Sequence, residues 1–145
     1  MTAETSDRIT TNSPEETEKF GESLSRSLAP GDTLLLYGDL GAGKTTLTRG
    51  ICRGLGISIV KSPSFVIVNV YAGKFTVYHI DLYRVESLDL ETAGEISEYM
   101  WDEDAIKIVE WAEHLPDELI PTGAIRIKLT RKSENQRTIT VEREK

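Results

Sequence analysis

The chain has 145 residues, 39% of them hydrophobic and 28% charged, and it carries a net charge of −7 at pH 7. This length suits one domain with a sizeable core, and the acidic balance disfavours nucleic-acid binding over the surface as a whole. A single cysteine excludes an internal disulfide and a cysteine-rich metal site, and no apolar stretch reaches membrane-spanning length.

The first predicted elements follow a polar N-terminus. We expect residues 1–7 to be loose and residues 8–11 to form a short edge strand. This polar start lacks the apolar core of a secretion signal, which favours a cytoplasmic location. Ser13 then predicts a helix N-terminus, because Pro14 suits the first helical position and Glu16 can complete a capping box.

A glycine-rich loop follows the next strand. The apolar run 33–37 predicts that strand, and residues 38–45 read Gly-Asp-Leu-Gly-Ala-Gly-Lys-Thr. This is the phosphate-loop pattern of glycine, four free positions, glycine-lysine and then serine or threonine. Apolar residues at helical spacing over 46–55 predict a helix directly behind the loop, and the dipole of that helix favours bound phosphate.

Each residue type in the loop has a chemical task. The glycines allow backbone conformations in which successive N–H groups point into one concavity and hold phosphate oxygens. Lys44 supplies a positive charge to the outer phosphates, and the Thr45 hydroxyl is a ligand for Mg²⁺. The loop therefore predicts a site for a nucleoside triphosphate and magnesium.

The rest of the chain alternates apolar strands with weaker helical segments. Apolar or alternating runs predict strands at 65–71, 75–80, 105–109, 125–129 and 139–141. A helical stretch is expected over 88–96, and an irregular or short helical one over 113–121. The fold class is therefore α/β: a single P-loop NTPase-like domain over 1–145, with a mixed, mostly parallel sheet flanked by helices and with antiparallel hairpins.

Two carboxylates come directly after apolar strands. Asp81 follows the run 75–80, and Glu110 follows the run 105–109. If both strands run parallel to the loop strand, the two acids emerge at the same sheet edge as the phosphate loop. We expect them to hold Mg²⁺ or to orient the attacking water, and the sequence leaves open which acid activates that water.

Several further side chains allow two interpretations. His79 precedes Asp81 by two residues and shares its sheet face, although a histidine in a strand is more often structural than catalytic. Trp111 can border the nucleotide or simply pack, and Ser62 and Ser64 can contact the γ-phosphate or serve a turn. A basic group near the C-terminus is typical of a solvated hairpin face or of a local patch: Arg126, Lys128, Arg131, Lys132 and Arg137.

In their order, four segments resemble the motifs of the TsaE (YjeE) family of ATPases. They are the phosphate loop within 36–47, Lys61-Ser62-Pro63-Ser64-Phe65, the run from Tyr78 to Arg84 and the run from Val109 to Glu113. Order and spacing agree over roughly residues 13–121. Two departures are Ser64, where the family usually has threonine, and Ala112, where proline is common.

The resemblance implies an ATPase needed for threonylcarbamoyladenosine at position 37 of tRNAs that read ANN codons. Family members act with TsaB and TsaD, so that TsaD makes the transfer, ATP hydrolysis resets the complex between turnovers, and tRNA is reached only through the complex. The residues implied to bind ATP are Gly38, Gly41, Ala42, Gly43, Lys44, Thr45, Thr46 and Trp111. Those implied to hold magnesium are Thr45, Glu110 and Asp81, and those implied to be catalytic are Asp81, Glu110 and Lys44.

Two other functions stay open at this point. A small-molecule kinase would need an acceptor pocket and an arginine-rich lid, and the middle of the chain offers only Arg84. A non-catalytic nucleotide sensor would dock on a partner in one nucleotide state. A GTPase is disfavoured, because the sequence contains no Asn-Lys-x-Asp guanine motif.

Overall fold

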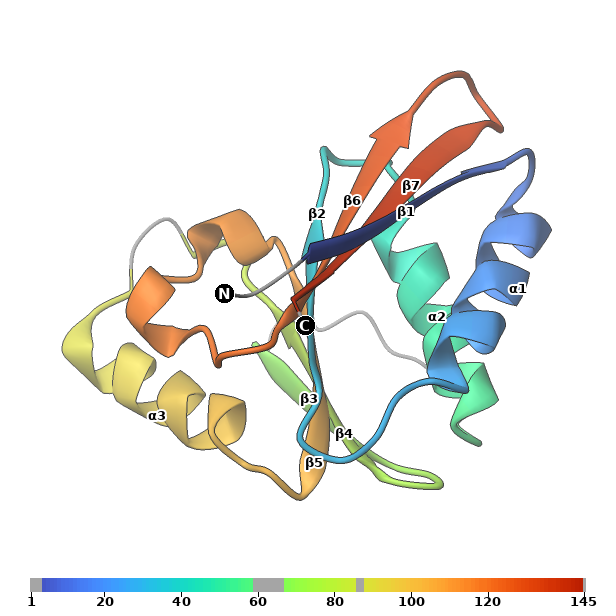
Figure 1. The fold of residues 1–145 in the computed structure, drawn as a ribbon. Helices are drawn as coiled ribbons and strands as arrows, with labels where there is room; N and C mark the ends of the chain where they lie inside the picture. Colours follow the sequence, from blue (N-terminus) through green and yellow to red (C-terminus); the bar gives the residue numbers. More distant parts are fainter. Residues whose placement is uncertain (1–3, 59–66, 86–87, 145) are drawn as a thin grey trace.

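The computed structural model describes residues 4–58, 67–85 and 88–144, which build one seven-stranded sheet with helices on both faces (Figure 1). The strands are β1 (Glu4–Thr11), β2 (Thr33–Tyr37), β3 (Val68–Ala72), β4 (Thr76–Asp81), β5 (Ala105–Glu110), β6 (Ile125–Arg131) and β7 (Arg137–Glu144). The helices are α1 (Pro14–Ser25), α2 (Lys44–Gly54) and α3 (Leu90–Met100), and two 3₁₀ turns, η1 (Ala112–His114) and η2 (Asp117–Leu119), follow β5. None of the helices in these ranges combines the length and apolarity needed to cross a membrane.

The strand order across the sheet is β1-β7-β6-β2-β5-β4-β3. β2 is parallel to both of its neighbours, β5 and β6, and β4 is parallel to β5. The flanking pairs β1–β7, β6–β7 and β3–β4 are antiparallel. The predicted α/β class with a parallel centre and antiparallel hairpins is confirmed. The carboxyl ends of β2, β4 and β5 therefore meet at one edge of the sheet.

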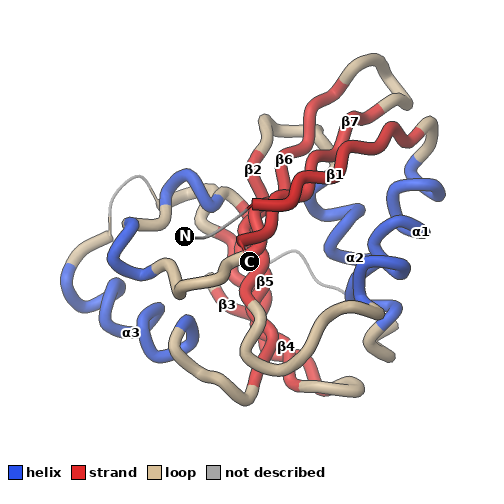
Figure 2. Tube along the Cα trace, viewed as in Figure 1, coloured by secondary structure: helices blue, strands red, loops and turns tan. Residues whose placement is uncertain are grey.

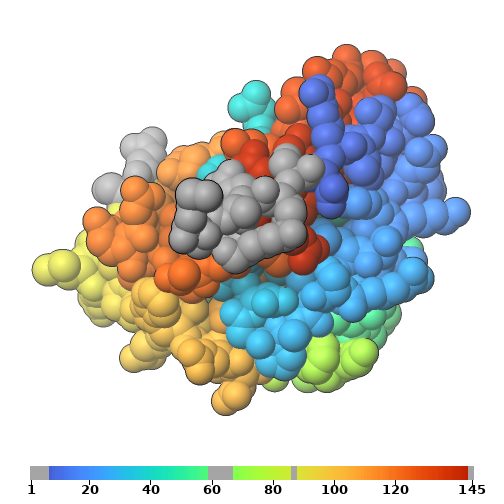
Figure 3. Space-filling view, viewed as in Figure 1, coloured from blue at the N-terminus to red at the C-terminus, as the bar shows by residue number. Residues whose placement is uncertain are grey.

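Side chains of the central strands alternate between two hydrophobic cores. In β2, Leu34 and Leu36 pack on the side of α1 and α2, whereas Leu35 packs on the side of α3. The tube view places these helices on opposite faces of the sheet (Figure 2). In the space-filling view, α1 and α3 lie toward opposite sides of the visible surface (Figure 3). Burial on both faces explains why β2 is a continuous apolar run instead of an alternating one.

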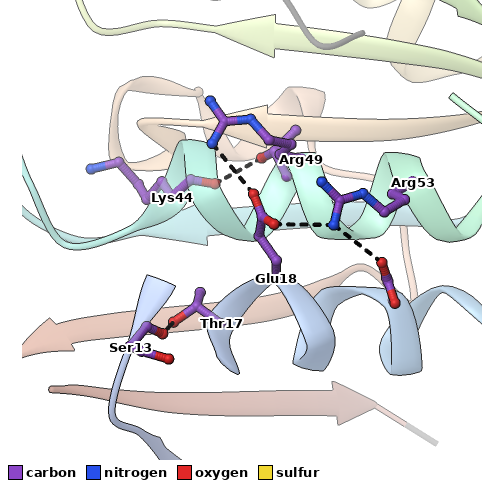
Figure 4. Close-up of polar contacts among 8 residues, drawn as sticks. Ser13, Thr17, Glu18, Lys44, Arg49 and Arg53 are labelled. Atoms are coloured by element: carbon purple, nitrogen blue, oxygen red, sulfur yellow. Dashed lines mark hydrogen bonds and ion pairs between the residues drawn. The ribbon is translucent and has the colours of Figure 1, made fainter. Parts of the chain in front are cut away.

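Helices α1 and α2 approach closely because glycines line their contact. A Cβ atom at Gly50 would lie 2.1 Å from the Glu18 carbonyl oxygen, and one at Gly21 would lie 2.7 Å from an α2 carbonyl oxygen. Beside these close approaches, the Glu18 carboxylate forms ion pairs with Arg49 at 3.5 Å and with Arg53 at 3.1 Å (Figure 4). The contact thus holds α2, and the loop that precedes it, at a set distance from α1.

The start of α1 confirms the predicted cap and alters the capping box in one respect. The Ser13 hydroxyl accepts a hydrogen bond from the Glu16 N–H at 3.1 Å, and Pro14 occupies the first turn. The Glu16 carboxylate accepts from the N–H of Asn12 at 3.2 Å, one residue before the cap. As in a capping box, two side chains thus satisfy backbone N–H groups that have no partner inside the helix.

Element boundaries differ from the prediction where tertiary pairing decides them. β1 begins at Glu4 and so includes part of the segment 1–7 that we expect from the sequence to be loose. The reason is β7, which pairs with β1 along its whole length, a partner that local composition does not reveal. The predicted strand 65–71 is described only in part, and the loop with Ser62 and Ser64 lies outside the described residues.

Candidate nucleotide site

The loop between β2 and α2 forms a cradle lined by glycine. Gly38, Gly41 and Gly43 have φ angles of 152°, 83° and 102°, which L side chains rarely adopt. A Cβ atom at Gly38 would also lie 2.7 Å from the Leu129 carbonyl oxygen of β6. Ala42 is buried and donates its N–H to a carbonyl within the loop at 3.0 Å. Such a loop at a helix N-terminus presents backbone N–H groups to an anion.

Lys44 is the first residue of α2, and its side chain turns back over the loop. It is 5% exposed, and Nζ donates to the Gly38 carbonyl and, at 3.2 Å, to the Asp39 carbonyl. The same Nζ lies 3.8 Å from the centre of the Trp111 ring. Burial lowers the pKa of Lys44, and nearby carboxylates, Glu113 first among them, oppose that shift. The ammonium group is therefore buried within the loop, where it can bind an anion held by the loop.

Thr45 and Glu110 meet where α2 faces the carboxyl end of β5. Thr45 Oγ1 donates a hydrogen bond to Glu110 Oε1 at 3.0 Å. Glu110 is the last residue of β5, pairs with Leu36 in the parallel register and is 2% exposed. A hydroxyl and a carboxylate oxygen in contact are ligands that Mg²⁺ takes beside a bound phosphate.

His79 contacts the other oxygen of Glu110. Its ring is fully buried in β4, and Nε2 donates to Glu110 Oε2. Nδ1 lies 3.5 Å from the Tyr71 hydroxyl of β3. The sequence favours a structural role for this histidine, and the structure places it against a predicted site residue. The signal for that contact is its position two residues before Asp81, on the same face of the strand.

Asp81 lies beside Glu110 at the end of β4. The two residues are partners in the parallel register, and Asp81 Oδ1 accepts the Tyr83 N–H at 2.9 Å. Burial raises the pKa of Asp81; the Tyr83 N–H bond opposes this rise, and the nearby Glu110 carboxylate adds to it. Asp81 therefore presents a carboxylate of raised basicity at the sheet edge that carries the phosphate loop.

Trp111 borders the site in an unusual backbone conformation. Its φ of 58° makes it the one non-glycine residue with positive φ in the part of the chain that the structure describes. Its ring centre lies 4.9 Å from that of Tyr83 and 5.8 Å from that of His114. His114 Nδ1 in turn donates to the Leu82 carbonyl at 2.6 Å. This cluster holds the indole against Lys44, and such backbone strain is typical of functional positions.

The side chains present fit a nucleotide with magnesium better than a metal centre made by protein alone. Over the described ranges, no group of three or more histidine, cysteine, aspartate or glutamate residues could hold a metal ion. Thr45 and Glu110 supply two oxygens, which suits an ion whose other ligands are phosphate oxygens and water. The glycine-lined loop at the N-terminus of α2 suits a phosphate.

A cavity of about 310 Å³ opens beside the cradle, and its lining includes Gly38, Lys128 and Arg131. Arg137 of β7 also reaches the loop, because its Nε would lie 3.7 Å from a Cβ atom at Gly43. From the sequence, these basic residues are typical of a solvated hairpin face or of a local patch. No sequence signal indicates their approach to the cradle, which arises when β6 and β7 pack beside β2.

Comparisons with known proteins agree with this architecture. A family model described as "Threonylcarbamoyl adenosine biosynthesis protein TsaE" matches residues 11–139. A Bacillus subtilis protein named "tRNA threonylcarbamoyladenosine biosynthesis protein TsaE" is 42% identical over 132 residues, which cover 90% of this chain and 81% of that protein. A Nostoc protein of the same name is 38% identical over 144 residues, covering 94% of this chain and 86% of the relative. The crystal structure of Bacillus subtilis YdiB superposes with a TM-score of 0.79 at 34% identity, covering 97% of this chain and 87% of that one.

Proposed function

Since this chain belongs to the TsaE family of threonylcarbamoyl adenosine biosynthesis proteins, we propose that it binds and hydrolyses ATP in the formation of threonylcarbamoyladenosine on tRNA. The observation that carries the proposal is the 3.0 Å contact of Thr45 Oγ1 with Glu110 Oε1, beside the glycine cradle at the start of α2. A hydroxyl and a carboxylate oxygen in contact are of the kind that Mg²⁺ takes as ligands beside a phosphate, which supports the proposal.

The cradle binds the ATP phosphates in this proposal. Within Gly41 to Thr46, the backbone N–H groups other than that of Ala42, which bonds inside the loop, hold the phosphate oxygens at the N-terminus of α2. Lys44 exchanges its carbonyl partners for the outer phosphates, which carry more negative charge than a carbonyl. Trp111, whose ring faces Lys44, borders these phosphates.

Thr45 and Glu110 are the residues that would hold Mg²⁺, with Asp81 as the adjacent carboxylate. The ion supplies positive charge that neutralises phosphate oxygens during transfer. The protein's part is to keep a hydroxyl and a carboxylate oxygen at fixed positions beside the cradle.

Asp81 is the better candidate for orienting the attacking water. Both carboxylate oxygens of Glu110 are engaged, one by Thr45 and one by His79. Asp81 is half-buried, and burial raises its pKa, which makes its ionised form a better proton acceptor. We therefore assign water orientation to Asp81 and stabilisation of the developing phosphate charge to Lys44.

The proposal extends to a complex with TsaB and TsaD, in which hydrolysis resets the complex between turnovers. The chain would reach tRNA only through these partners, in keeping with its net charge of −7. Turnover by the isolated chain is expected to be slow. The reason is that Arg137, although it reaches the cradle, is already engaged: its guanidinium group donates to the turn carbonyls of Ser133 at 2.9 Å and Glu134 at 3.1 Å.

Replacing Glu110 with glutamine tests the proposal. We expect Glu110→Gln to lower ATP hydrolysis by at least about 10-fold, the lower end of what loss of a ligand's hydrogen-bonding partner costs, because the charge of a metal-binding carboxylate is lost. Hydrolysis is measured as phosphate release, and binding of magnesium-ATP by calorimetry. The matched control is Glu142→Gln, since Glu142 pairs with Lys128 at 3.3 Å on the C-terminal hairpin.

The same variant separates an ATPase from a nucleotide sensor. In a reconstituted complex with TsaB and TsaD, Glu110→Gln should assemble normally and yet support far less modified tRNA. Full modification by a variant that no longer hydrolyses ATP would show instead that only nucleotide binding is needed. Absence of any binding heat with magnesium-ATP would contradict both functions.

A further inference from the structure

The hydrolysis scheme uses His79 only as a partner of Glu110, and yet this side chain is one of the most completely buried polar groups in the chain. Its exposed fraction is 0%, and that of Glu110 is 2%. A buried imidazole loses its contacts with water and must be compensated by hydrogen bonds inside the protein. The position of those bonds therefore shows what the residue contributes.

The two oxygens of Glu110 have different partners from different elements. Oε1 accepts from Thr45 on α2, and Oε2 accepts from His79 on β4. A carboxylate held at one oxygen only can still rotate about its last torsion angle, which is broad for glutamate. The second bond removes that freedom, so Oε1 stays directed at Thr45.

The ring of His79 is itself held in place. A carboxylate only accepts hydrogen bonds, so Nε2 carries a proton in the contact with Glu110, and Nδ1 is the ring nitrogen on the side of Tyr71. The Tyr71 hydroxyl lies 3.5 Å from that nitrogen, and the two ring centres are 6.1 Å apart. A line of contacts thus runs from β3 through His79 to Glu110 and ends at Thr45 on the helix behind the cradle.

A purely structural histidine would require only that the ring fill its space in the core. Two observations go beyond filling space: the donor atom points at a carboxylate, and that carboxylate is in contact with the hydroxyl of the phosphate-loop helix. In metal sites, partners that hydrogen-bond a carboxylate ligand set its orientation and tune its affinity for the ion.

We propose that His79 is a positioning residue: its Nε2–H holds Glu110 so that Oε1 and the Thr45 hydroxyl together form the binding place for the magnesium ion of the nucleotide. This inference rests on the proposed function, because it requires that Glu110 be a magnesium ligand. His79 itself touches neither nucleotide nor ion in this assignment.

The test compares two polar replacements of different reach. His79→Gln places an amide nitrogen near the position of Nε2 and can still donate to Glu110, whereas the shorter His79→Asn places it near Nδ1 and cannot. Val77→Ala is the control for lost stability, because Val77 is fully buried on the same face of β4. Each protein is titrated calorimetrically with ADP at a series of Mg²⁺ concentrations and also in the presence of EDTA.

We expect His79→Asn to raise the Mg²⁺ concentration for half-maximal enhancement of ADP binding by about 10–100-fold. ADP affinity in EDTA should stay unchanged, and His79→Gln should restore most of the Mg²⁺ dependence. In the hydrolysis assay, the loss for His79→Asn should appear in the apparent KM for Mg²⁺ and be largely recovered in kcat at saturating Mg²⁺. If His79→Asn does not fold, Tyr71→Phe serves as a second variant and should give a smaller shift in the same direction.

Equal Mg²⁺ dependence of His79→Asn, His79→Gln and the unmodified protein would overturn the inference. So would a Mg²⁺ shift of the same size in Val77→Ala, because the effect would then follow from loosened packing. If the unmodified protein binds ADP with no Mg²⁺ dependence at all, the proposed function fails first, and that outcome is distinct from failure of the His79 assignment.

Discussion

Lys44 is held by partners that are individually weak for an ammonium ion. Nζ donates to the carbonyl oxygens of Gly38 and Asp39, and the Trp111 ring centre lies 3.8 Å away. Phosphate oxygens carry full negative charge and form stronger, charge-assisted hydrogen bonds. A bound triphosphate should therefore draw Nζ away from the indole.

Trp111 emission should report this displacement. The chain has two tryptophans, and Trp101 is 52% exposed, so Trp101→Phe leaves Trp111 as the single indole at little structural cost. We expect magnesium-ATP to change the emission of that variant and to leave it unchanged when Lys44→Met is added. Unaltered emission under conditions where calorimetry detects binding would mean that Lys44 stays on the ring.

At the scale of elements, the position of α2 depends on its close contact with α1. Gly50 has no room for a side chain, because a Cβ atom there would lie 2.1 Å from the Glu18 carbonyl oxygen. The same helix carries Lys44 and Thr45 in its first turn. A displacement of α2 would therefore move both the loop lysine and the hydroxyl that faces Glu110.

Gly50→Ala should lower the free energy of unfolding by about 1–3 kcal/mol, the usual cost of overpacking a well-filled contact. Gly94→Ala in α3 is the matched control, since nothing lies within 4 Å of a Cβ atom there. That control should stabilise the protein by about 0.5–1 kcal/mol, because alanine favours helix over glycine. Denaturant unfolding measures the free energy of unfolding of both variants. Equal stability changes of the two variants would contradict the close α1–α2 contact.

Across the whole molecule, the two edges of the parallel sheet are built differently. The carboxyl edge carries the cradle, Glu110 and Asp81. At the amino end of β5, the buried Lys107 donates to three backbone carbonyls, and Tyr78 reaches from β4 to donate to Asp102 at 2.5 Å. The hydrogen bonds of Lys107 and Tyr78 to Asp102 thus connect the segment that follows α3 to the sheet.

The Tyr78–Asp102 bond predicts a stability that changes at both ends of the pH range. The bond raises the pKa of Tyr78 from 10.0 to about 12 and lowers that of Asp102. A raised folded-state pKa means that the Tyr78 contribution is complete below pH 10 and is lost as the pH rises toward 12. A lowered folded-state pKa means that the contribution of Asp102 to stability is complete above its ordinary pKa of 3.8. That contribution is lost as the pH falls through the lowered pKa.

Tyr78→Phe should therefore lower the unfolding temperature by about 1–4 °C near neutral pH, and this difference should shrink in acid and above about pH 11. Thermal unfolding followed by circular dichroism across the pH range measures it. Tyr99→Phe is the control, because Tyr99 is the neighbouring aromatic ring at 4.9 Å. A difference independent of pH would rule out this hydrogen bond as its source.

Short apolar runs in the sequence were sufficient to predict the central strands and the acidic residues that follow them. The apolar run 33–37 is β2 without change, and parallel strands bring Asp81 and Glu110 into register, as their positions after apolar runs imply. Contacts between distant segments were not predictable. The sequence indicates that His79 shares a strand face with Asp81, but its bond to Glu110 depends on strand order, as does the approach of Arg137 to the cradle.

The place of β6 beside β2 has a consequence for the order of events during synthesis. Both strands that flank β2 in the sheet, β5 and β6, come later in the chain, and the Leu129 carbonyl of β6 forms a wall next to Gly38. A ribosome-bound chain that ends before residue 125 therefore carries the complete glycine motif without one of its walls. A nucleotide that needs the complete cradle would therefore stabilise only a chain in which β6 has been made and has paired with β2.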